Sequence, residues 1–131
     1  MRHAHLALRV GLAFAFLYPP VAAISDPVTW AAYFPSFVHE LPIDITIILH
    51  AFGALEVVLA VWILSGWRVR VPALIASGLL VAIVVLNMNN FEVVFRDLSI
   101  AAMAFALALW PDVSESRQLS SLPPADQARL G

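Results

Sequence analysis

Long apolar blocks, rather than a helical or strand period, dominate this sequence. They cover residues 6–24, 43–64, 71–86 and 98–110. A helix that crosses a membrane needs about 20 predominantly apolar residues, with a range of roughly 17–25. The first two blocks meet this length. The third reaches it when Asn87 and Met88 are added, and the fourth does so when it begins at Phe91.

The composition supports a membrane location. The chain is 62% hydrophobic and 12% charged, whereas a soluble domain is roughly 45–50% apolar and about 25% charged. Cysteine is absent, which removes disulfides, Cys-ligated zinc and Cys-ligated iron–sulfur clusters. The net charge of −2 gives no basic surface for nucleic acid. We therefore expect membrane lipids, and no nucleic acid, as partners.

The blocks predict an all-α protein, an integral membrane four-helix bundle within residues 1–110. Its helices are expected at about 6–24, 43–64, 71–88 and 91–110. Residues 111–131 are rich in Ser, Pro and Gln and lack an apolar period. They predict a disordered cytoplasmic tail.

The arginines indicate the orientation. If the N-terminus is inside, Arg96 is the only arginine in an outer segment, and the inner segments hold Arg2, Arg9, Arg68, Arg70, Arg117 and Arg129. Because basic residues favour the cytoplasmic side, we expect a multi-pass protein of the bacterial inner membrane with both termini cytoplasmic. An alternative is that residues 1–23 are a signal peptide cleaved after Ala23, which would leave three helices.

The first outer loop carries an aromatic stripe. Asp26 and Pro27 are typical of an N-cap followed by Pro at the first helical position. The aromatic residues then recur at spacings of three and four: Trp30, Tyr33, Phe34 and Phe37. This pattern predicts a short helix in the outer interface. The rings either anchor the loop among lipid headgroups or cover a pocket as a lid.

Polar side chains inside the apolar blocks are candidates for function. At ~1.5 Å rise per residue, His50 lies ~10 Å and Glu56 ~20 Å below the outer end of the second helix. Three residues from other helices fall near the depth of His50: Tyr18, Arg96 and Asp97. Gly53, between His50 and Glu56, would let another helix approach closely. These residues predict a small polar site that opens outward. The alternative is that they only join helices by hydrogen bonds, which are common in membrane bundles.

Several segments resemble the DoxX family of small bacterial membrane proteins. The similar stretches are residues 8–12, 26–35, 53–59, 68–70 and 95–98, and the resemblance covers about residues 6–110. It implies four transmembrane helices. One branch of the family resembles the quinone-reducing subunit of a thiosulfate oxidoreductase, so the resemblance also implies a link to membrane redox chemistry.

These observations favour a subunit or accessory of a quinone-linked membrane redox system. In this hypothesis Tyr18 and His50 hydrogen-bond a quinone carbonyl, and Asp97 or Glu56 carries the proton. No motif encodes an electron-carrying cofactor and no metal site is expected, so a redox partner would supply the electrons. The sequence assigns no enzymatic activity to the chain alone, and a homo-oligomer stays open. The alternatives are a carrier or channel-like protein for small solutes or protons, and a non-catalytic scaffold for a membrane partner.

Overall fold

The computed structural model describes residues 2–110, 121 and 123–127. Every regular element in these ranges is a helix: α1 (Arg2–Ser25), α2 (Pro27–Ala31), α3 (Ser36–His39), α4 (Ile45–Ser65), α5 (Arg70–Leu86), the 3-10 helix η1 (Met88–Asn90), α6 (Phe91–Ala108) and α8 (Pro124–Gln127). The predicted tail, 111–131, lies mostly outside the described residues. Its described part includes the short helix α8.

Local signals in the sequence set several helix ends. The Asp26 carboxylate accepts a hydrogen bond of 3.2 Å from the Thr29 N–H, with Pro27 at the start of α2, which confirms the predicted cap. Asp44 caps α4 in the same way through the Thr46 N–H, at 2.8 Å. α4 ends at Gly66, whose φ of 77° lies in the left-handed region that glycine adopts without strain. The prolines Pro19 and Pro20 lie inside α1, which continues through them.

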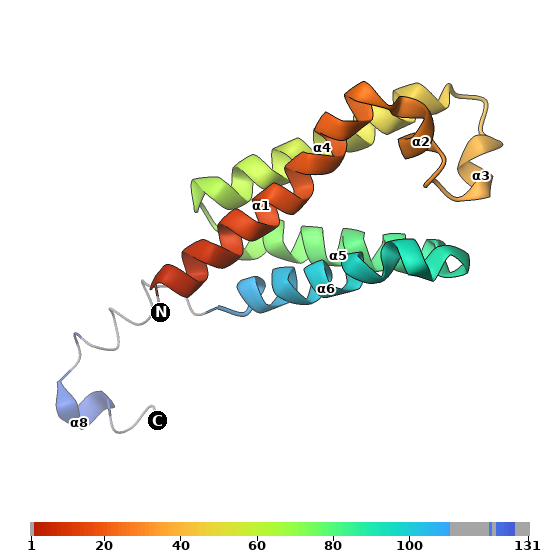
Figure 1. Cartoon of the computed structure of the whole chain (residues 1–131). Helices are drawn as coiled ribbons and strands as arrows, with labels where there is room; N and C mark the ends of the chain where they lie inside the picture. The colour runs from red at the N-terminus through yellow and green to blue at the C-terminus, as the bar shows by residue number, and fades with distance from the viewer. Residues whose placement is uncertain (1, 111–120, 122, 128–131) are drawn as a thin grey trace.

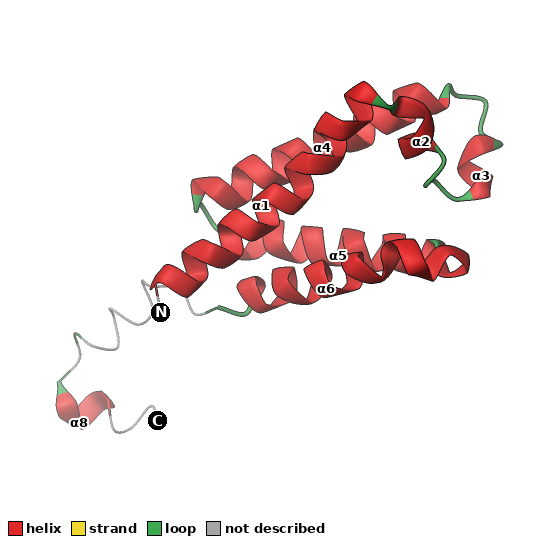
Figure 2. Ribbon diagram, viewed as in Figure 1, coloured by secondary structure: helices red, strands yellow, loops and turns green. Residues whose placement is uncertain are grey.

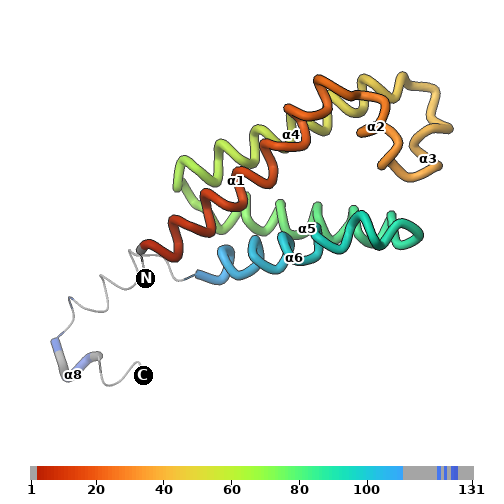
Figure 3. Tube along the Cα trace, viewed as in Figure 1, coloured from red at the N-terminus to blue at the C-terminus, as the bar shows by residue number. Residues whose placement is uncertain are grey.

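The four long helices form two arms (Figures 1 and 2). α1 packs mainly on α4, and α5 packs mainly on α6. Hydrogen bonds from Arg70 to Ala108 and from Ser77 to Ala101 show that α5 and α6 run antiparallel. The Cα trace in Figure 3 shows the arms close together near the α4–α5 turn. They diverge toward the end that carries α2 and α3.

The end where the arms meet holds the main core. Small side chains let the helices approach closely there, among them Ala60, Ala73, Ala76 and Ala104, each fully buried. Two arginines also join helices at this end. The Arg9 guanidinium donates to the carbonyls of Ile63, at 2.8 Å, and Leu64 near the end of α4. Arg70 donates to the last carbonyl of α6, at 3.1 Å. Both cations therefore lie where the helix dipole favours positive charge.

Two helices are long and apolar enough to cross a membrane, His3–Ser25 and Ile45–Ser65. α5 and Met88–Ala108 form a third candidate if they are one broken span, with a bend of 83° at the break. The structure therefore confirms an all-helical fold with two or three candidate spans, but it does not confirm the predicted four-helix membrane bundle. The reason is physical: α5 has 17 residues, about 26 Å of helix, and α6 begins with a segment that contains Glu92, Arg96 and Asp97.

The outer faces of the arms are strongly apolar. Large hydrophobic side chains are more than half exposed on several helices, including Phe14 on α1, Val61 on α4 and Val85 on α5. Apolar surface of this extent marks contact with membrane or partner. It agrees with the apolar spans of α1 and α4.

Candidate functional site

A cavity of about 550 Å³ lies between the two arms, toward the end where they diverge. Residues of α1, α4, α5 and α6 line it, together with the segment that carries α2 and α3. Its walls are mainly apolar and aromatic, with a few polar side chains. Cavities of about 300–1,000 Å³ with such walls are typical of sites for small molecules.

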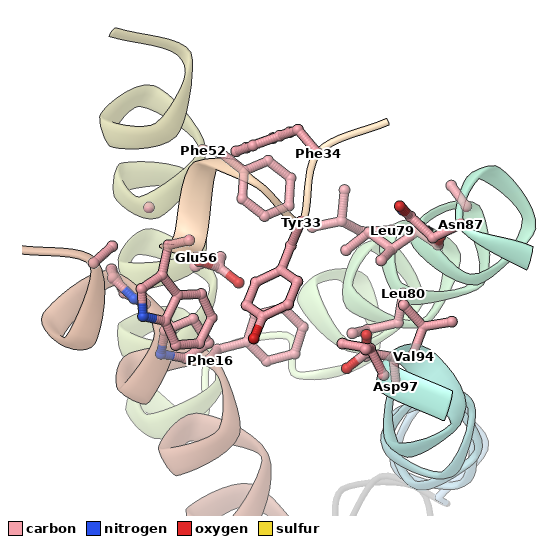
Figure 4. Close-up of a pocket in the computed structure, with 18 of the residues that line it drawn as sticks. Phe16, Tyr33, Phe34, Phe52, Glu56, Leu79, Leu80, Asn87, Val94 and Asp97 are labelled. Carbon is pink, nitrogen blue, oxygen red and sulfur yellow. Dashed lines mark hydrogen bonds between the residues drawn. The ribbon is translucent and has the colours of Figure 1, made fainter. Parts of the chain in front are cut away.

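Glu56 is the most deeply buried ionisable residue that lines this cavity. Its side chain is only 9% exposed, and it lines the cavity from α4. No described residue forms a hydrogen bond or an ion pair with it. Figure 4 shows its carboxyl group facing the cavity beside Phe16 and Tyr33. A buried carboxyl without a protein partner is costly, so this placement needs a functional explanation.

Asp97 lines the same cavity from the opposite arm. It is half-buried on α6, next to Val94 and across the cavity from Glu56 (Figure 4). Arg96, its neighbour in the chain, also lines the cavity and is more exposed. The site therefore contains two carboxyl groups, one from each arm, and one guanidinium.

The aromatic segment after α1 closes part of the opening. All four predicted rings line the cavity: Trp30, Tyr33, Phe34 and Phe37. Ring contacts tie this segment to both helices of its arm, with centroids 6.3 Å apart for Trp30 and Tyr18 and 5.8 Å apart for Phe34 and Phe52. Figure 4 shows Tyr33 projecting into the space between Glu56 and Asp97. Their position in the cavity wall agrees with the lid interpretation. Contact of these rings with lipid headgroups stays a prediction.

A single carboxylate holds the start of this segment. The side chain and the backbone N–H of Thr29 both hydrogen-bond to Asp26 and keep the pKa of that exposed carboxyl below its usual value of 3.8. Asp26 is therefore ionised at neutral pH and complements the N-terminus of α2. The cap helps to place Trp30 and the rings that follow it over the cavity.

Two prolines add backbone acceptors to the wall. Pro19 and Pro20 have no N–H, so the carbonyls of Ala15 and Phe16 lose their usual partners one turn earlier in α1. All four of these residues line the cavity. A freed carbonyl at membrane depth must face protein or a polar cavity. The sequence predicted this requirement, and the residues that carry these carbonyls line the cavity.

The structure separates the predicted polar residues into two groups. Glu56, Arg96, Asp97 and Tyr18 line the cavity, although the Tyr18 side chain is 60% exposed. His50 does not line it: its ring is exposed, and its Nδ1 lies 2.7 Å from the Thr46 carbonyl in its own helix. His50 and Asp97 were expected at the same depth in the membrane, but only Asp97 lines the cavity. Glu56, expected to lie alone below that level, is instead opposite Asp97.

Some wall residues carried no distinctive signal in the sequence. Phe52 and Leu79 are ordinary members of apolar blocks, and only the packing of the arms brings them to the cavity. Asn87 is a buried polar residue at the end of α5, and its amide donates to the Ile83 carbonyl at 3.0 Å. Its position before Asn89 and Asn90 could have indicated the break between α5 and η1, because Asn is frequent in turns.

Gly53 joins the two helices of the first arm beside the cavity. A Cβ atom at this position would lie 3.0 Å from the Cβ of Pro20. The absence of a side chain therefore lets α1 and α4 approach here, as the sequence predicted.

Comparisons with family models, with curated proteins and with solved structures give no match. The chemistry of the site must therefore be argued from its own residues. Among the described residues no three His, Cys, Asp or Glu side chains gather where they could hold a metal ion. What the arrangement offers is an aromatic cavity with two carboxyl groups that can accept hydrogen bonds and carry protons.

Proposed function

We propose that this chain is an integral membrane protein that binds a small amphipathic molecule between its two arms and exchanges a proton with it through Glu56. One observation carries the proposal: Glu56, a residue only 9% exposed, presents a carboxyl group without a hydrogen-bond partner among the described residues to an aromatic cavity. Such a group is costly unless a ligand or a proton completes its environment.

In its first form, the protein is a DoxX-like subunit or accessory of a quinone-linked redox system. A quinone ring suits the aromatic walls, and its oxygens would meet Tyr33, Glu56 and Asp97. A partner protein would supply the electrons. Co-purification of a dehydrogenase or a quinol oxidase supports this form. We place the protein in the bacterial inner membrane with α1, α4, α5 and α6 all crossing it and both termini cytoplasmic.

The second form is a carrier for a small solute or for protons. The divided architecture favours it, because each arm contributes one carboxyl group to the cavity and the arms diverge at one end. Movement of one helix pair against another is a common way to expose a site alternately to two sides of a membrane.

Direct binding tests the proposal. The full-length protein in nanodiscs is titrated with decylubiquinone as an amphipathic probe, by isothermal titration calorimetry. L79W places a bulky ring in the cavity wall, whereas L74W adds the same ring to an exposed position on α5 outside the cavity. We expect L79W to weaken binding at least tenfold and L74W to bind like the unmodified protein. Equal binding by both variants would place the probe on the lipid-facing surface and contradict the proposal.

A further inference from the structure

The charges around the cavity specify the kind of ligand that fits it. Two carboxyl groups, Glu56 and Asp97, and one guanidinium, Arg96, line the cavity. The other ionisable groups in the wall are the phenols of Tyr18 and Tyr33. When both carboxyl groups are ionised, the wall therefore carries one net negative charge among the described residues that line the cavity.

The walls are suited to a cation with a hydrophobic body. The face of an aromatic ring is electronegative and attracts cations, above all quaternary ammonium groups. Rings from several elements line the same cavity as Glu56: Phe16 on α1, Trp30 on α2, Tyr33 and Phe34 in the following turn, and Phe52 on α4. The carbonyls of Ala15 and Phe16, freed by the two prolines, add acceptors and no donors.

From this geometry we infer that the cavity binds lipophilic monocations, such as hydrophobic amines in their protonated form and quaternary ammonium or phosphonium ions. The inference rests on the proposed function, since it specifies the ligand of the same cavity. The cation pairs with the Glu56 carboxylate, and its hydrophobic substituents contact the rings. When Glu56 is protonated beforehand, its proton leaves to water at the open end as the cation enters, so one positive charge replaces another. This exchange matches the carrier form of the proposal.

The test compares probes of similar shape and different charge. The full-length protein in nanodiscs of zwitterionic lipid is titrated by calorimetry with tetraphenylphosphonium, with the isosteric anion tetraphenylborate and with decylubiquinone. We expect tetraphenylphosphonium to bind and tetraphenylborate not to bind. E56Q keeps the shape of the side chain and removes its charge, and should weaken tetraphenylphosphonium binding at least tenfold. E92Q is the matched control, because Glu92 is an exposed carboxyl on α6 outside the cavity.

The pH dependence gives a second readout that needs no variant. Tetraphenylphosphonium binding should weaken as the pH falls, because protonation of Glu56 and Asp97 removes the negative charge from the wall. Decylubiquinone is uncharged and should show no parallel loss.

The outcomes separate the inference from the proposed function. Binding of decylubiquinone that L79W weakens, without binding of tetraphenylphosphonium, overturns the cation inference and keeps the proposed function. Equal tetraphenylphosphonium binding by E56Q and the unmodified protein also overturns the inference. Binding of neither probe overturns both.

Discussion

At the scale of the residue, two positions govern the cavity through opposite properties. Glu56 supplies a carboxyl group that no described residue hydrogen-bonds, whereas Gly53 has no side chain and thereby lets α1 pass close to α4. The two lie one turn apart on α4. The contact of α1 with α4 thus sets the position of the wall that presents Glu56.

Enlarging Gly53 should open this contact. In G53A the new Cβ atom would lie 3.0 Å from the Cβ of Pro20, so Pro20 must move by a few tenths of an ångström. Overpacking costs about 1–3 kcal/mol. Gly78 is the matched control, because it also lies inside a helix but has no atom within 4 Å of its added Cβ. G78A should be neutral or stabilising by about 0.5–1 kcal/mol. Thermal unfolding in detergent measures both, and equal melting temperatures would contradict the close contact.

At the scale of the element, helix ends are stabilised by charges of the expected sign. Carboxylates cap the N-termini of α2 and α4, and arginines from neighbouring helices bind the C-terminal carbonyls of α4 and α6. The caps are local in sequence, whereas the arginine contacts join distant segments. The first kind can be predicted from sequence, and the second requires the fold.

The Asp26 cap should make stability depend on pH in the acidic range. Its pKa is lowered in the folded protein, so its contribution is present above the unfolded value and is lost as the pH falls through the folded value. D26A should therefore melt below the unmodified protein at pH 6, and the difference should shrink as the pH falls below 3.8. D26N keeps a capping side chain without a titratable charge. The melting temperature of D26N should therefore lack this contribution to the pH dependence. If the difference in melting temperature between D26A and the unmodified protein did not change with pH, that result would contradict the cap.

Removing the Arg9 contacts should destabilise the first arm. R9M retains much of the aliphatic chain but leaves the carbonyls of Ile63 and Leu64 without their donor. Hydrogen bonds from charged groups contribute about 1.5–3 kcal/mol, and we expect a loss in this range. R68M is the control, because exposed Arg68 contacts mainly the Trp67 ring, 5.8 Å away. Its loss should stay within about 1 kcal/mol. Chemical denaturation in detergent compares the two, and the idea fails if R9M is no less stable than R68M.

At the scale of the whole molecule, the open question of architecture is how many times the chain crosses the membrane. If α5 and α6 each cross, the turn at Met88–Asn90 and the turn at Trp67 lie on opposite sides. If α5 and α6 instead form a re-entrant pair, the turn between them is inside the membrane, and the hydrogen-bonded ends at Arg70 and Ala108 lie on the same side.

We expect four crossings, and single cysteines can test this directly because the chain has no cysteine of its own. Asn89 and Trp67 are both exposed in their turns. In intact cells, N89C should react with a membrane-impermeant maleimide and W67C should react only after the cells are lysed. Failure of N89C to react with the reagent from either side would favour the re-entrant pair. Reactivity of W67C in intact cells would reverse the orientation inferred from the arginines.

The sequence predicted the helices more completely than it predicted the site. Apolar blocks and cap residues depend on neighbours in the chain, so the helices and the Asp26 cap were predicted within a few residues of their observed ends. Depth along a helix also follows from counting residues, which is why Tyr18, Glu56, Arg96 and Asp97 were all selected. His50 was selected on the same ground and lies outside the cavity, because depth does not specify the direction a side chain faces.

What the sequence determined by itself is therefore one-dimensional: an all-helical, strongly apolar chain, with polar groups at known positions along its helices and an aromatic segment between its first two long helices. What only the tertiary structure decided is which faces meet. The close contact of α1 and α4 at Gly53 and the divergence of the two arms turn Glu56 toward Asp97 and place the rings around them. The physical reason is that helix rotation and crossing depend on side-chain packing between distant segments, a property that neighbours in the chain do not encode.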